Sequence, residues 1–148
     1  MKKIIPLIAA AMLAIGLCAC TSSTLEVTAN GDFIHAQAQN QAEGSGSGDI
    51  KIEEGYGVCI NHIVEKGSFH VKIVSAGGEV VFDDDIDDNI AEMIDAEPGD
   101  YEVMITADKA TGTLDIIPYD KQAQAMAEAT MPEYLKEMVD EQKENKSK

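Results

Sequence analysis

Residues 56–73 read YGVCINHIVEKGSFHVKI, and this stretch decides the fold because apolar residues recur at every second position. The alternating set before Glu65-Lys66-Gly67 is Tyr56, Val58, Ile60 and His62, and the set after it is Phe69, Val71 and Ile73. Alternation with a period of two is typical of a strand that buries one face. The segment therefore predicts two strands separated by a turn.

The same pattern continues on both sides of this segment, with Gly- or Pro-containing turn signals between short apolar sets. The further sets are Ile50 and Ile52; Val80 and Phe82; Tyr101, Val103 and Ile105 after Pro98-Gly99; and Leu114 and Ile116 after Gly112. Evenly spaced short strands predict an all-β domain, a small antiparallel β-sandwich of jelly-roll-like form, over residues 25–119. We expect one shared core that contains Ile60, Phe69, Val71, Ile73, Tyr101, Val103 and Ile105.

The first part of this domain contains two glycine signals of different kinds. Asn30-Gly31 lies inside the alternating segment 25–36. A two-residue type I′ turn there predicts a hairpin that sets Glu26 opposite His35. The run Gly44-Ser-Gly-Ser-Gly48 breaks the alternation, and it is either a flexible linker or a Gly-rich passage into the next strand.

We expect residues 120–148 to form a helical tail that is acidic, lysine-rich and partly disordered at its end. Residues 121–129 are rich in good helix formers. Thr130-Met-Pro-Glu133 resembles a capping box that starts a second helix, with Leu135, Met138 and Val139 on one apolar stripe. This narrow stripe either packs weakly on the sandwich or stays free for a partner.

The N-terminus has the pattern of a secretory signal. Lys2 and Lys3 precede the apolar run 4–17, which is shorter than the about 20 residues that a membrane span needs. A charged start, an apolar run and a small residue before the cut together predict a signal peptide over residues 1–19.

The end of this signal, Leu17-Cys18-Ala19-Cys20, resembles the lipobox of bacterial lipoproteins. That resemblance implies cleavage before Cys20 and a diacylglyceryl group on its thiol. Two acyl chains are what stable anchoring needs. Residues 20–24 would then be a lipidated tether at the extracytoplasmic face of the cell membrane, and the alternative is simple secretion with cleavage nearby.

Charge narrows the range of partners. Cleavage would remove two of the 11 lysines and none of the 27 acids, which leaves 9 positive charges against 27 negative ones, a net charge of −18. Arginine is absent from the sequence, so no bidentate guanidinium fork is available for phosphate. We expect no nucleic-acid partner, and we expect the overall field to repel polyanions and anionic headgroups.

The sequence shows no pattern of residues that predicts catalysis. Cys59 is the one thiol left beyond Cys20, and its apolar neighbours predict a small buried side chain. His35, His62 and His70 lack the local spacing of zinc ligands, and no nucleophile-elbow motif occurs. We therefore expect no enzyme activity and no cofactor.

The densest run of oxygen ligands is Asp83-Asp84-Asp85-Ile86-Asp87-Asp88-Asn89. Asp83, Asp85, Asp87 and Asn89 stand at alternate positions, as in calcium-binding loops. The EF-hand pattern then fails, because Asp88 stands where glycine is needed and Ile94 where the bidentate Glu should be. The alternatives are a solvated acidic loop and a weak calcium site.

Residues 48–118 also resemble a group of small uncharacterised lipoproteins of Gram-positive bacteria. The resemblance is carried by Val64-Glu65-Lys66-Gly67-Ser68, by Glu97-Pro98-Gly99-Asp100-Tyr101-Glu102-Val103 with Thr106, and by Lys109-Ala110-Thr111-Gly112-Thr113. It implies a compact sandwich at the cell surface and supplies no active site. The expected function is a membrane-anchored, non-catalytic binding or envelope-structural module, and the alternative is an accessory subunit of a surface enzyme or transporter.

Overall fold

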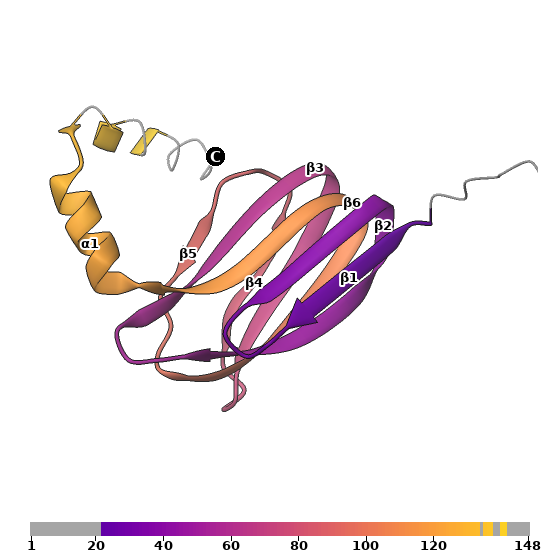
Figure 1. Ribbon diagram of the computed structural model, residues 1–148, viewed down its shortest axis with the longest axis horizontal. Helices are drawn as coiled ribbons and strands as arrows, with labels where there is room; N and C mark the ends of the chain where they lie inside the picture. Colours follow the sequence, from indigo (N-terminus) through magenta and orange to yellow (C-terminus); the bar gives the residue numbers. More distant parts are fainter. Residues whose placement is uncertain (1–21, 134, 138–139, 142–148) are drawn as a thin grey trace, which may run out of the picture.

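A computed structural model of the protein describes residues 22–133, 135–137 and 140–141. Most of this chain is in strands, and one helix follows them (Figure 1). The elements are β1 (Thr24–Ala29), β2 (Ile34–Ile52), β3 (Tyr56–Ser75), β4 (Val80–Ile86), β5 (Glu92–Ile94), β6 (Gly99–Asp120) and α1 (Lys121–Thr130). The all-β fold class predicted from the sequence is confirmed.

The strands form one antiparallel sheet in the order β1-β2-β6-β3-β4, with β5 paired to the first part of β3. The last strand in the sequence, β6, is therefore central, because it pairs with β2 on one side and with β3 on the other. These three strands are long and bent, and each one runs through both layers of the sandwich (Figure 1).

The bends lie together at one end of the molecule, which we call the fold-over end. It comprises Asn40–Ala42 of β2, Glu65–Gly67 of β3 and Lys109–Gly112 of β6, where the pairing registers shift. The opposite end, where these strands begin and end, is the open end; it contains Gly31, the turn at 53–55 and the turn at 76–78.

The core lies between the two layers and is lined by alternate residues of each strand. The expected set of Ile60, Phe69, Val71, Ile73, Tyr101, Val103 and Ile105 is buried in one cluster, as predicted. Each buried Ile, Val or Phe contributes about 1.5–3 kcal/mol through its removal from water. Phe69 is the largest of the fully buried side chains.

The predicted turns at Glu65-Lys66-Gly67 and Gly112 are bulges inside continuous strands. Gly67 has a positive φ of 65°, and a Cβ there would collide with the backbone carbonyl of Lys109. Gly112 is likewise pressed against the Ile63 carbonyl. Glycine at these points permits close contact between bent neighbouring strands, and it gives the same local sequence signal as a turn.

The hairpin predicted at residues 25–36 exists, but the predicted register is wrong. Ala29 pairs with Ile34, so the loop has four residues and Glu26 lies opposite Gln37 rather than His35. The side chain of Asn30 accepts hydrogen bonds from the backbone N–H groups of Asp32 (2.9 Å) and Phe33 (3.0 Å). This side-chain turn replaces the expected two-residue loop and shifts the partners by two positions, which leaves the inward face unchanged.

The Gly-rich run lies inside β2 and is not a linker. A Cβ on Gly46 would lie 2.6 Å from Cγ2 of Val27, and a Cβ on Gly48 would lie 2.5 Å from Cβ of Ala29. The run pairs with β6 from Gly44↔Ala107 to Gly48↔Val103. These two glycines let the second half of β2 approach β1 across the sandwich.

The tail begins with α1, whose side chains are exposed or half-buried. Asp120 caps this helix by accepting hydrogen bonds from the N–H groups of Gln122 and Ala123, and no α1 side chain is buried. Helical residues resume at Glu133, while Met138 and Val139 of the predicted stripe lie outside the described residues. Among the described residues, no helix has the length and apolar character needed to cross a membrane.

We expect Gly48→Ala to lower the free energy of unfolding by about 1–3 kcal/mol, because the new methyl group would overlap Ala29. Ser47→Ala is the matched control, since Ser47 is the exposed neighbour, and its effect should stay within about 0.5 kcal/mol. Urea unfolding followed by circular dichroism measures both. Equal stability of the two variants would show that β1 does not pack on Gly48.

Candidate functional site

The first half of the acidic run lies on strand β4 rather than in a loop. Asp83 and Asp85 pair with Lys72 and His70 of β3 on the outer face of the sandwich. Lys72 Nζ lies 2.8 Å from Asp83 Oδ2, and the His70 ring lies 2.9 Å from both Asp83 Oδ1 and Asp85 Oδ1. Asp84 is exposed on this edge strand, where charged side chains discourage pairing with another chain.

The electrostatics of this cluster favour the ionised form of Asp83. The hydrogen bond from Lys72 lowers the pKa of the Asp83 carboxyl below its ordinary value, and the nearby His70 adds to this effect. The cluster is exposed to solvent. It is therefore a screened surface network that connects β4 and β3.

The second half of the run leaves β4 and crosses towards β5. Asn89 Oδ1 accepts a hydrogen bond from the backbone N–H of Val64 at 2.6 Å. Asp88 Oδ1 lies 3.2 Å from Nε2 of His62, and the backbone N–H of Ile90 also donates to it. Asp87 is exposed beside them. The loop is thus fastened to β3 by its own side chains.

The four predicted calcium ligands are divided between these two places. Asp83 and Asp85 contact Lys72 and His70 of β3 on the outer face, whereas Asn89 bonds to the backbone of Val64. Across residues 22–133 and the described parts of the tail, no cluster of three or more His, Cys, Asp or Glu is arranged to hold a metal ion. Calcium binding stays a prediction that calorimetric titration of the mature domain decides, with Asp85→Asn and Asp87→Asn as variants.

His62 is the buried polar residue of the core. Its side chain is 0% exposed, and its Nε2 is hydrogen-bonded to Asp88 Oδ1. Nδ1 is buried and has no hydrogen-bond partner among the described groups. Sequence alternation predicted that His62 lies at a partly buried edge of the core; the structure places it further inside.

A surface hollow of about 600 Å³ lies at the open end. Its lining includes Gly31, Asp49, Lys51, Ser75, Asp100 and Tyr101. The Tyr101 hydroxyl donates a 2.7 Å hydrogen bond to the Glu97 carbonyl. Burial, with a smaller contribution from neighbouring carboxylates, raises the pKa of this phenol. Tyr101 is therefore a neutral, positioned group in a hollow whose other charged groups are mostly acidic.

A neighbouring hollow of about 240 Å³ shares Lys51 and is also lined by Glu53 and Tyr56. The start of the tail is fixed beside this end, because Lys121 forms an ion pair with Asp95 and donates to the Ala96 carbonyl at 3.0 Å. The hydrogen bond to Asp95 raises the pKa of Lys121. The open end therefore has two adjoining hollows, which the sequence pattern did not predict because their lining comes from five separate segments.

A short row of apolar side chains lies on the outer face of the sheet, where β5, β3 and β6 are paired. Cys59 pairs with Met93 of β5 on one side and with Ile117 of β6 on the other. Met93 and Ile117 are 44% and 39% exposed, and Cys59 is half-buried. The expectation of a buried Cys59 is therefore wrong, because Val58 and Ile60 take the inward positions. Partial burial raises the pKa of the Cys59 thiol.

The first described residues are fastened to the fold-over end. The Asn40 side-chain amide donates to the Ser22 carbonyl, and the Ser23 hydroxyl donates to the Gln41 carbonyl, both at 3.1 Å. The Gln41 N–H in turn donates to Thr111 Oγ1 at 3.0 Å. Cys20, the predicted lipidation site, lies outside the described residues.

No family model and no curated protein matches the chain. Among solved structures, a Drosophila melanogaster CENP-C bound to CAL1 is similar at a TM-score of 0.36 and 14% identity, over 66% of this chain and 81% of that one. The Drosophila melanogaster CENP-C cupin domain is similar at a TM-score of 0.36 and 13% identity, over 66% and 80%. Similarities of this size carry no inference about function.

We expect Asp83→Asn to destabilise the protein at neutral pH, since Lys72 and His70 lower the pKa of this carboxyl in the folded state. A carboxyl whose folded pKa is depressed stabilises above its unfolded pKa, and this contribution is lost as the pH falls through the folded value. The difference from the wild type should therefore shrink below the ordinary pKa of 3.8.

Thermal unfolding over a pH series at low and high salt measures this effect. Glu26→Gln, at an exposed position of β1, is the control. A stability difference for Asp83→Asn that stays constant from neutral to strongly acidic pH would contradict the ion-pair explanation.

Proposed function

We propose that the protein is a lipoprotein anchored at the extracytoplasmic face of a bacterial cell membrane, where its sandwich acts as a non-catalytic binding or envelope-structural module. The lipobox-like sequence Leu17-Cys18-Ala19-Cys20 supports this proposal. Cleavage before Cys20 would leave this cysteine as the acylated N-terminus. Two acyl chains suffice for stable attachment of a soluble domain.

The observation that carries the proposal is how soon the folded domain begins. Strand β1 starts at Thr24, and Ser22 and Ser23 are already bonded to β2. Only Thr21 separates Cys20 from this bonded segment. A cut before Cys20 would therefore remove the signal without removing any residue of the sandwich.

The open-end hollow is the place in this structure best suited to a ligand or partner. It combines one cation, Lys51, with the acids Asp49 and Asp100 and the Tyr101 phenol. These groups offer hydrogen bonds and charge, and the hollow is wide enough for a side chain or a small polar molecule. Binding there requires no covalent chemistry.

The second candidate is an accessory subunit of a surface enzyme or transporter. The apolar row Met93-Cys59-Ile117 and the exposed Met126 of helix α1 favour it, because exposed apolar groups often mark protein interfaces. Cross-linking in membranes, followed by identification of co-purifying proteins, separates the two. A stoichiometric enzyme or transporter partner would replace the first candidate by the second.

We expect Cys20→Ser to abolish lipidation and to move the protein from the membrane and detergent phase to the soluble phase or to an uncleaved precursor. Cys18→Ser is the matched control, since it removes a cysteine two positions earlier and leaves Cys20 in place. Detergent phase partition and the mass of the N-terminal peptide are the measurements. A Cys20→Ser protein that still partitions like the wild type would disprove the anchor.

A further inference from the structure

The link between the proposed anchor and the sandwich is short and is attached at a defined place. Ser22 and Ser23 are bonded to Asn40 and Gln41 at the fold-over end. Two residues in extended conformation span at most about 7 Å, which is the reach from Cys20 to Ser22. A lipid on Cys20 would therefore hold the fold-over end close to the bilayer surface.

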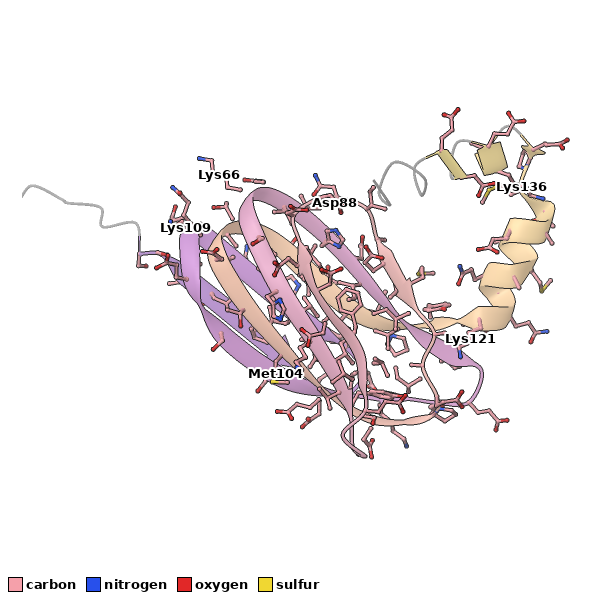
Figure 2. The ribbon with its side chains drawn as sticks, turned by 180° about the vertical axis from the view of Figure 1, so that it is seen from behind. Lys66, Asp88, Met104, Lys109, Lys121 and Lys136 are labelled. Atoms are coloured by element: carbon pink, nitrogen blue, oxygen red, sulfur yellow. The ribbon has the colours of Figure 1, made fainter. Side chains whose placement is uncertain are left out.

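The fold-over end also presents two lysines beside this attachment point. Lys66 belongs to the bulge of β3, and Lys109 belongs to the bend of β6, where it has a positive φ of 49°. The close approach of Gly67 to the Lys109 carbonyl brings the two bends together. Figure 2 shows both lysines on the side of the molecule where the N-terminal segment joins β1.

These two lysines, like Lys51 at the open end, form no ion pair with any described residue. Lys72 and Lys121, by contrast, form ion pairs with Asp83 and Asp95. Lys66 and Lys109 are both exposed. Their ammonium groups are thus available to an outside anion.

We infer that the fold-over end is a membrane-contacting surface whose Lys66 and Lys109 bind the phosphate groups of phospholipid headgroups. The inference rests on the proposed lipid anchor at Cys20. An ammonium close to a phosphate-rich surface gains favourable interaction over a distance of one Debye length, which is about 8 Å at physiological salt. The tether keeps both lysines at about this distance from the headgroup phosphates.

Negative charge limits the strength of this contact. Glu65 belongs to the fold-over end, Glu43 and Asp108 adjoin it in the sequence, and the loop with Asp87 and Asp88 lies beside it. The chain as a whole is strongly acidic. Lys66 and Lys109 would therefore orient a domain that the acyl chains already hold, and they would not recruit it to the membrane by themselves.

The inference also predicts on which side of the anchored domain the hollow of about 600 Å³ lies. In each layer, half of a long strand connects the fold-over end to the open end. In β3, this half comprises residues 56–64. At roughly 3.3 Å per residue, this separates the two ends by about 30 Å. The open-end hollow would therefore face away from the bilayer, towards ligands or partners in the surrounding medium.

The test uses the lipidated protein in phosphatidylcholine–phosphatidylglycerol vesicles that contain a headgroup nitroxide. In a Cys59→Ala background, a fluorophore is attached at Glu65→Cys in the fold-over end or at Glu54→Cys in the open end. The two positions are matched because each is an exposed Glu. We expect strong quenching at position 65 and almost none at position 54.

Charge reversal then tests the lysines. Lys66→Glu with Lys109→Glu should lower the quenching at position 65 at least twofold, while Lys51→Glu, an exposed lysine of the open end, should leave it unchanged. Vesicle flotation measures attachment separately. Attached protein with equal quenching at both positions would overturn the membrane-contacting surface and leave the anchor intact.

Two other outcomes are equally decisive. Quenching at position 65 that survives the double reversal would show that the tether alone sets the orientation, and it would overturn the lysine–phosphate contact. Protein that fails to float with vesicles and carries no acyl mass would instead disprove the lipid anchor. The failure of the anchor and the failure of the contact are therefore distinguishable.

Discussion

Three strands, each of which runs through both layers of the sandwich, are the constraint on which the rest of the structure depends. Strands β2, β3 and β6 each contribute one half to each layer. The inward residues of a strand's first half therefore face those of its second half across the core. The bends must coincide for the layers to close, and they do so at the fold-over end. A bend displaced by one residue in any strand would turn its second half inside out.

This constraint explains which parts of the fold could be predicted from the sequence. Alternation with a period of two identifies the inward faces correctly, because the burial of Phe69 or Val103 follows from its position within its own strand. Glycine signals are ambiguous, because a residue such as Gly67 serves equally well in a hairpin turn and in a bulge. The need for Gly46 and Gly48 depends on contacts with β1, which no local pattern records.

The candidate sites show the same division between local and long-range information. The acidic run was evident from the sequence, but its pairing with His70 and Lys72 depends on the register of β4 on β3. The open-end hollow combines residues near positions 31, 50, 75 and 100, which only the fold brings together. The attachment of Ser22 and Ser23 to the bend of β2 depends likewise on the tertiary structure. The lipobox-like sequence, by contrast, lies outside the described residues and is known only as a pattern.

The central position of β6 has a consequence for how the chain folds. Strands β2 and β3 lie on opposite sides of β6, and partners such as Ile34 and Ile116 are far apart in sequence. Before residues 99–120 are available, the chain can form only separate hairpins, and these have no common core. High contact order of this kind makes folding slow. A chain still emerging from a ribosome or a translocation channel would therefore stay unfolded until its last strand arrived, which is the state that passage through a narrow export channel requires.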